Sequence, residues 1–349
     1  MTLSACFIVK DEESVIARAL NCAVKIADEI IVVDTGSVDS TVEEAKKFTD
    51  DIYFIKWRDD FSYARNYALD KATCDYVIWL DADDVISDED CKKIKNLVDG
   101  GGFDMAYLPY IAAPNFVYYR ERIFRRDKNY RFSGFVHEAV APFGKVVYSD
   151  AKIHHKKLKE GDPLRNLRIY QNAIARGICL DERSKFYYGR ELMFNKMYVE
   201  CIAVLEDFLK GDGWVENKIE ACHNLYSVYT AVGESERAVF SLLRSFVYAP
   251  PRSKACCILG SIFSGKNDVK SAIYWYERAL NSVENPQNGG FIDLDFCGYI
   301  PYMELCVLYD KIGDFKKANE YNEAAGKIKP LCPNYLSNKK YFEQKLKDI

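Results

Sequence analysis

The chain is poor in histidine and has no long apolar run. Only 4 of its 349 residues are histidine, and no stretch approaches the ~20 apolar residues that a membrane-spanning helix needs. The amino-terminal sequence MTLSACFIVKDEES also lacks the basic and long apolar segments of a signal peptide. We therefore expect no membrane span and a cytoplasmic location.

Paired-cysteine motifs are absent as well. The 12 cysteines are scattered, none forms a C-x-x-C pair, and most fall in apolar periodic runs. This pattern argues against a disulfide framework and against a zinc site, because both need cysteines at short, regular spacings. We expect the cysteines to be small buried side chains in a reducing compartment.

An excess of positive charge is also missing. The formal net charge of −4 argues against a nucleic-acid partner, which usually meets a basic face. The hydrophobic fraction of 49% and the charged fraction of 29% are typical of a soluble globular protein. Because 349 residues exceed the usual size of a single domain, two domains are expected.

The two halves of the sequence follow different hydrophobic periods. Up to about residue 160, short apolar runs such as Leu3–Val9, Glu29–Val33 and Tyr76–Leu80 alternate with helical patterns, which predicts an α/β layer fold. From there to the end, nearly every segment has the helical period. We therefore predict an α/β domain over residues 1–160 and an all-α domain over residues 161–349.

Small residues recur in the helical half at a nearly constant interval. Alanines follow turn signals at 203, 238, 272 and 318, with spacings of 35, 34 and 46 residues. A period near 34 is that of tetratricopeptide repeats, whose concave face binds an extended partner. An irregular helical bundle is the alternative. The tyrosine-rich segment Phe186–Tyr188 could be core at the domain junction, or an exposed patch through which the protein forms a homo-oligomer.

A cluster of carboxylates follows one predicted strand. Asp81-Ala82-Asp83-Asp84 comes directly after the apolar run Tyr76–Leu80, so the charge gathers at a sheet edge. Crowded carboxylates repel one another unless a cation lies between them, and oxygen ligands favour Mg²⁺ or Mn²⁺. The alternative is a solvated acidic turn before a helix capped by Ser87.

Other polar residues are expected near the same edge. Asp34 ends the second predicted strand, where ligands bind in open α/β sheets, and could accept hydrogen bonds from a ribose or a base. Gly36 would allow close backbone approach, although Asp34–Ser37 also reads as an ordinary turn. Arg65 lies in the first turns of a helix, a poor place for a cation unless it faces an anion such as a phosphate or Asp81. A surface arginine is the alternative.

Three of the four histidines lie close together in the sequence. His137-Glu138 follows a glycine turn and could provide a general base. His154 or His155 could complete a metal site, because neutral imidazole is a common metal ligand. Each histidine taken alone is also compatible with a structural role.

Together these motifs resemble family 2 glycosyltransferases. Five of them occur in the family's order: FIVKDE from Phe7, VDTGSVDST from Val33, DFSYARN from Asp60, WLDADD from Trp79 and VHE from Val136. More specifically, the chain resembles bacterial members of the family that carry tetratricopeptide repeats after the catalytic domain, including SunS-like peptide glycosyltransferases. It extends into the helical half through YGREL from Tyr188 and YMELC from Tyr302.

The resemblance implies a GT-A fold, a nucleotide-diphosphate sugar donor and inversion at the anomeric carbon. Asp34 matches the nucleoside-binding aspartate of the family and Arg65 the arginine beside the donor. Asp81 and Asp83 match its D-x-D motif, with Asp81 as a donor contact and Asp83 as the contact for Mn²⁺ or Mg²⁺. UDP-hexoses, such as UDP-glucose and UDP-N-acetylhexosamines, are the leading donors by resemblance.

Glu138 falls where the family carries its catalytic base, and His155 fits a histidine that reaches the metal or the diphosphate. The chain departs from the family at Asp11, where Asn is common, and after His155, where the family often has H-x-G-Y. His154 is therefore the alternative to His155.

The acceptor is expected to be a protein or peptide held by the repeats, because an extended surface suits a macromolecule. The alternatives are a glycan or lipid-linked acceptor in surface-polysaccharide synthesis, and a non-catalytic scaffold with a relic transferase domain.

Overall fold

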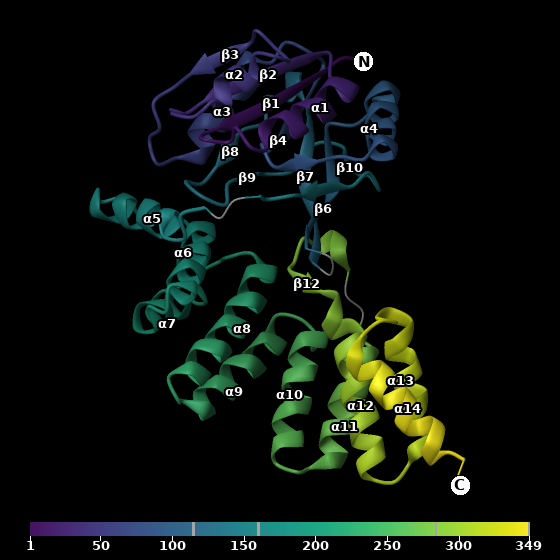
Figure 1. The fold of residues 1–349 in the computed structure, drawn as a ribbon. Helices are drawn as coiled ribbons and strands as arrows, with labels where there is room; N and C mark the ends of the chain where they lie inside the picture. Colours follow the sequence, from purple (N-terminus) through teal and green to yellow (C-terminus); the bar gives the residue numbers. More distant parts are fainter. Residues whose placement is uncertain (114–115, 159–160, 283–284, 348–349) are drawn as a thin grey trace. The chain divides into compact units, whose positions relative to one another are not determined.

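The computed structural model describes residues 1–113, 116–158, 161–282 and 285–347 (Figure 1). The chain divides into two compact units, Met1–Asn217 and Lys218–Ile349. The predicted domain boundary after residue 160 falls at residues 159–160, which lie outside the described residues. The helices between that point and residue 217 belong to the first unit, together with the α/β part.

The first unit begins with alternating strands and helices and ends with helices. In chain order its elements are β1 (Leu3–Val9), α1 (Ile16–Ile26), β2 (Glu29–Asp34), α2 (Thr41–Ala45), β3 (Ile52–Phe54), α3 (Phe61–Lys71), β4 (Tyr76–Leu80), β5 (Asp84–Val85), α4 (Asp88–Gly100), β6 (Met105–Ala113), β7 (Phe116–Arg125), the 3-10 turn Arg126–Lys128, β8 (Phe132–Ser133), β9 (Ala139–Val140), β10 (Val146–Tyr148), β11 (Ile153–His155), α5 (Arg165–Ala175), α6 (Glu182–Phe194) and α7 (Tyr198–Phe208).

The main sheet of this unit is mixed. Its strand order is β3-β2-β1-β4-β7-β6-β11-β5, and β10 pairs with β6. β1 is parallel to β2 and β4, whereas β7 is antiparallel to β4 and β6. Since β1 lies in the middle with both faces covered, its sequence is apolar without alternation. The predicted α/β fold of this part of the chain is confirmed.

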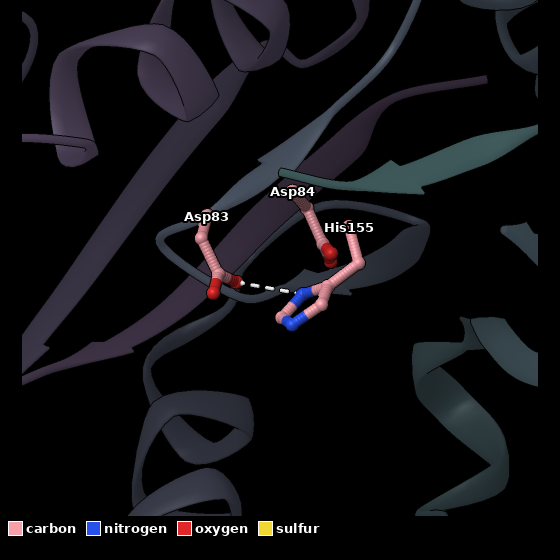
Figure 2. A group of neighbouring side chains, drawn as sticks. All are labelled: Asp83, Asp84 and His155. Atoms are coloured by element: carbon pink, nitrogen blue, oxygen red, sulfur yellow. Dashed lines mark ion pairs between the residues drawn. The ribbon is translucent and has the colours of Figure 1, made fainter. Parts of the chain in front are cut away.

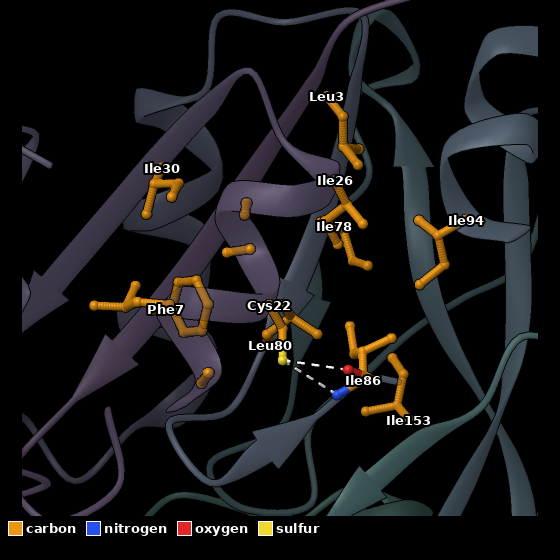
Figure 3. Packing of buried hydrophobic residues seen from close by; sticks show 14 of the residues in the cluster. Leu3, Phe7, Cys22, Ile26, Ile30, Ile78, Leu80, Ile86, Ile94 and Ile153 are labelled. Atoms are coloured by element: carbon orange, nitrogen blue, oxygen red, sulfur yellow. Dashed lines mark hydrogen bonds between the residues drawn. The ribbon is translucent and has the colours of Figure 1, made fainter. Parts of the chain in front are cut away.

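The core on one face of the sheet lies against α1 and α4 (Figure 3). Phe7 and Leu80 from the sheet and Ile94 from α4 are almost fully buried there. Cys22 packs among them, and its Sγ lies 3.4 Å from both the backbone oxygen and the backbone nitrogen of Ile86. All 12 cysteines are free, and Cys22 behaves as a small apolar side chain.

The parallel strands bring the predicted site residues to one edge. In the β1–β2 ladder Val9 faces Asp34, and in the β1–β4 ladder Phe7 faces Leu80. The carboxyl ends of β1, β2 and β4 therefore meet at a single edge, and the acidic residues after Leu80 begin there.

The second unit is mostly helical. Its elements are α8 (Val215–Ala231), which begins just before the unit, then α9 (Ser235–Arg244), the 3-10 turn Ser245–Val247, α10 (Ser253–Gly265), α11 (Val269–Leu280), the 3-10 turn Pro286–Asn288, β12 (Ile292–Asp293), the 3-10 turn Leu294–Cys297, α12 (Tyr299–Lys311), α13 (Phe315–Ile328) and α14 (Pro333–Lys345). Among the described residues, no helix combines the length and apolar character that crossing a membrane requires.

One turn recurs between the helices of four pairs, α6–α7, α8–α9, α10–α11 and α12–α13. Each turn has a residue with positive φ two positions before the second helix: Lys196, Gly233, Asn267 and Gly313, with φ of 60°, 82°, 61° and 82°. The next backbone N–H donates to a carbonyl five residues back, as in Met197 to Leu192 at 2.9 Å and Asp314 to Tyr309 at 3.0 Å. This is the Schellman arrangement of a helix end.

The second helix of each pair also carries a buried small residue at its fourth position. These residues are Cys201, Ala238, Ala272 and Ala318. The predicted alanines at 238, 272 and 318 are confirmed, but Ala203 is wrong because it is exposed and Cys201 occupies the equivalent position. The helical part is therefore built from helix–turn–helix repeats of the tetratricopeptide kind.

Candidate functional site

A cleft of about 660 Å³ opens at the strand edge of the first unit. Its lining includes five of the predicted site residues: Arg65, Asp81, Asp83, Glu138 and His155. The rest of the lining comes partly from the loop after β1 and partly from α5. Residues that are far apart in the sequence are thus brought into one concave site.

The acidic segment after β4 forms a tight turn into β5. The backbone N–H of Asp84 donates to the carbonyl of Asp81 at 3.0 Å, and the N–H of Asp81 donates to the Asp84 carboxylate at 3.0 Å. β11 pairs antiparallel with β5, which sets His155 opposite Asp84. The Nδ1 atom of His155 then lies 3.2 Å from Oδ1 of Asp83 (Figure 2).

Asp83, Asp84 and His155 form a group that could hold a cation. One ligand atom of each lies within 4.8 Å of the others. The interaction with the Asp83 carboxylate raises the pKa of His155, although partial burial works in the opposite direction. Successive residues of a strand point to opposite faces, so His154 points away from this group. Of the two candidate histidines, the structure brings His155 to the carboxylates.

Asp84 has a second partner inside the protein. Its Oδ2 lies 2.9 Å from Nη1 of Arg122, and both side chains are fully buried. Burial raises the pKa of Asp84 to about 6, although Arg122 works in the opposite direction. Its Oδ1 is buried and has no hydrogen-bond partner in the part of the chain that the structure describes. Two carboxylates and one imidazole with a spare buried oxygen fit a divalent cation of the Mg²⁺ or Mn²⁺ type.

Arg65 joins two of the predicted site residues. Its Nη2 lies 2.7 Å from Oδ1 of Asp81, and its Nε donates to Oε1 of Glu138. The guanidinium also stacks over the ring of Trp79, with Cζ 4.2 Å from the ring centroid. Although burial works in the opposite direction, Arg65 and the neighbouring arginines hold the pKa of Asp81 well below its usual range. Arg65 is therefore a buried, doubly paired cation rather than a surface residue.

Glu138 lines the cleft, and the residue before it in the sequence has an unusual backbone geometry. Its side chain is buried against Arg65. The preceding residue, His137, has φ of +54°, and its Nε2 lies 3.1 Å from Oε1 of Glu191 on α6. The His137-Glu138 pair thus faces the cleft from a strained turn held by a helix outside the α/β part.

Asp34 and Gly36 are not among the residues that line the cleft. The Asp34 carboxylate is buried and accepts the backbone N–H groups of Gly36 and Ser37 at 2.9 and 3.0 Å. Gly36 has φ of +108° with open space where a Cβ would stand. Asp34–Ser37 therefore form the ordinary turn that was the alternative prediction for this segment. Within the turn, Thr35 lines the cleft.

The arginines of β7 also belong to the site, although no role was predicted for them from the sequence. Arg120 lines the cleft, Arg122 pairs with Asp84, and both stack on Trp79, with Cζ 4.5 and 3.8 Å from the ring. Their alternation along a strand, at positions 120 and 122, places them on one face. The spacing of two positions was a sequence signal that the arginines share a face. It does not identify their partners, which lie about 40 residues away in the sequence.

The fold and the cleft define an α/β domain with an acidic, arginine-lined site at the ends of parallel strands. Residues 4–152 match the family described as "Glycosyl transferase family 2". These residues are therefore similar to that family, and tetratricopeptide-like helices follow them.

Two curated proteins illustrate the similarity. The chain is 30% identical over 230 residues to the SPbeta prophage-derived glycosyltransferase SunS of Bacillus subtilis, covering 60% of this chain and 52% of that protein. It is 38% identical over 97 residues to a TPR repeat-containing protein of Synechococcus elongatus, covering 28% of this chain and 24% of that protein. The chain thus spans about half the length of the first relative.

Among solved structures, TarS of S. aureus in complex with UDP-GlcNAc aligns with 15% identity and a TM-score of 0.42. The alignment covers 69% of this chain and 90% of that chain.

Proposed function

We propose that this protein is a metal-dependent, inverting glycosyltransferase that moves a hexose from a UDP-sugar to a protein or peptide. The observation that carries the proposal is the cleft in which Arg65, Asp81, Asp83, Glu138 and His155 meet. These are the residues that match the family's motifs, and they lie within the family domain or directly beside it.

The donor would lie along the strand edge. Asp34 and Gly36 would border the nucleoside beside Thr35, which lines the cleft. Asp81 and Arg65 would contact the sugar and the diphosphate, because their ion pair faces the cleft and an arginine matches phosphate oxygens in geometry.

Asp83 and His155 are the proposed metal contacts. Their side chains are only partly buried, so a bound group can reach them. A Mn²⁺ or Mg²⁺ ion held there would neutralise the charge that develops on the diphosphate leaving group.

Glu138 is the proposed base. The acceptor's nucleophilic atom attacks C1 of the sugar while the bond from C1 to the diphosphate oxygen breaks, and the acceptor's proton passes to Glu138. Attack from the face opposite the leaving group inverts the anomeric carbon. The ion pair with Arg65 fixes the carboxylate within the cleft, as positioning of a base requires.

The helical repeats support a macromolecular acceptor. Stacked helix pairs present an extended surface, which suits a polypeptide better than a small sugar. We further propose that residues 1–160 form the catalytic domain, that residues 161–349 bind the acceptor or a second copy of the chain, and that the protein works in the cytoplasm.

A thermal-shift screen of nucleotide sugars, with and without Mn²⁺, tests this proposal. A ligand present at about 100 times its Kd stabilises the folded state by about 2.7 kcal/mol. This corresponds to a rise in Tm of roughly 5–10 °C for a domain of this size. We expect a UDP-hexose with Mn²⁺ to give such a rise, and no rise with any nucleotide sugar would contradict the proposal.

A further inference from the structure

Three residues on one face of α6 contact His137 in the α/β part. The contacting residues, Arg183, Tyr187 and Glu191, are four positions apart, so they lie on the same side of the helix. Nε of Arg183 donates to the His137 backbone oxygen at 3.0 Å. The Tyr187 ring stacks on the imidazole with centroids 4.2 Å apart and planes at 14°. Oε1 of Glu191 lies 3.1 Å from Nε2 of the same imidazole.

Glu191 is itself fixed in place. Its side chain is buried, and Nδ2 of Asn166 on α5 donates to the same oxygen at 3.1 Å. Because a carboxylate can only accept, the imidazole donates from Nε2, and the proton on that nitrogen sets the tautomer of His137. The ring therefore has one orientation relative to α6.

The turn that carries His137 is held from the other side as well. The backbone N–H of Phe61, at the start of α3, donates to the carbonyl of Phe135 at 2.9 Å. The hydroxyl of Tyr170 on α5 donates to the carbonyl of Val136 at 3.1 Å. His137 nevertheless adopts φ of +54°, which a residue with a Cβ rarely adopts without support from its surroundings.

We propose that α6 is a clamp that fixes the His137 turn and thereby positions Glu138 in the cleft. Glu138 follows His137 directly, and the direction of its side chain depends on the backbone angles that the clamp imposes. Glu191 is then a positioning residue, although it lies outside the residues 4–152 that the family model matches. The inference rests on the proposed function for the role of Glu138, but the clamp can be tested without any activity.

The test compares three variants of the full chain. Glu191→Ala removes the contact with His137, whereas Glu191→Gln keeps an oxygen that can accept the same hydrogen bond. Glu200→Ala removes an exposed carboxylate from α7 and serves as the matched control. The rate of hydrogen exchange at the backbone amides of residues 133–140 measures how firmly the turn is held. UDP release from a UDP-hexose with Mn²⁺ measures its consequence, and calorimetry with UDP measures donor binding.

We expect the segment 133–140 to exchange faster in Glu191→Ala than in the wild type or in Glu200→Ala. Turnover should fall by up to about 100-fold, because a small displacement of a catalytic group has effects of that size. The Kd for UDP should not change, and Glu191→Gln should recover most of both properties.

If residues 133–140 exchanged at the same rate in Glu191→Ala as in Glu200→Ala, the proposed clamp would be wrong. Faster exchange with unchanged turnover would overturn the positioning role, and so would a loss in Glu191→Gln as large as that in Glu191→Ala. A wild type that releases no UDP would contradict the proposed function, while the exchange data would still decide whether α6 is a clamp.

Discussion

The Nδ1 atom of His155 lies 3.2 Å from the Oδ1 atom of Asp83. The two residues are 72 positions apart, and the antiparallel pairing of β11 with β5 brings them together. The contact brings an imidazole nitrogen to the acidic turn after β4, so Asp83, Asp84 and His155 together could hold a cation.

Substitutions in this pair should weaken metal-dependent donor binding. In calorimetry with UDP and Mn²⁺, we expect Asp83→Asn and His155→Ala each to raise the Kd at least about 10-fold, because even residues behind the ligands commonly have effects of this size. His154→Ala is the matched control, because this neighbour points to the other face of β11. An equal loss in His154→Ala would show that the assignment of His155 is wrong.

The buried pair of Asp84 and Arg122 should matter for stability. Asp84→Ala leaves the Arg122 guanidinium without its carboxylate partner in a fully buried position. Breaking a buried pair in this way costs about 3–5 kcal/mol of unfolding free energy. Asp88→Ala, which breaks the exposed pair with Lys25, should have little effect in the same denaturant titration. Similar unfolding free energies for the two variants would count against this reading.

The contact between α6 and α7 should not tolerate a methyl group at Gly189. A Cβ there would stand 2.3 Å from Cδ2 of Leu205, which is itself fully buried. Overpacking of this kind costs about 1–3 kcal/mol, so Gly189→Ala should lower the Tm. Gly265, near the end of α10, has open space at its Cβ position, and Gly265→Ala should leave the Tm unchanged or raise it slightly. If both variants melted like the wild type, the packing of α6 on α7 would be looser than described.

His137 should make the protein less stable in acid. Burial lowers the pKa of His137 below its ordinary value of 6.5, and Arg190 acts in the same direction, although Glu191 and Glu138 favour the charged form. Below pH 6.5 the unfolded chain therefore binds a proton that the folded chain resists, so the stabilising contribution is present above 6.5 and is lost as the pH falls.

The variant His137→Asn isolates this effect, because Asn tolerates a positive φ and does not titrate in this range. Its Tm should fall less between pH 7 and pH 5.5 than that of the wild type. Equal slopes for the two proteins in this range would contradict the prediction.

Local patterns in the sequence were sufficient to predict much of the fold. The apolar run of β1, the strand ending at Leu80 and the helix cap at Ser87 each depend on neighbouring residues, and the structure contains all three. The repeats were also predicted, but the first was placed at Ala203 instead of Cys201, because cysteine was not considered as the small residue of the repeat.

Partners across the fold could not be predicted in the same way. Arg65 and Glu138 are 73 residues apart, and Asp84 and Arg122 are 38 apart, so local sequence patterns do not predict that they pair. The choice of His155 over His154 likewise depends on the register of β11 with β5. Glu191 was not predicted as part of the site. It stands in the YGREL segment that carries part of the resemblance, but that segment does not indicate a contact with His137.

Release of UDP from UDP-hexoses in the presence of Mn²⁺ tests the central claim most directly, because water can replace the unidentified acceptor. We predict slow release by the wild type, and release about 10²–10⁴-fold slower by Glu138→Gln, which keeps the shape of the side chain without its ability to accept a proton. No release from any UDP-hexose, or equal rates in the two proteins, would contradict the account.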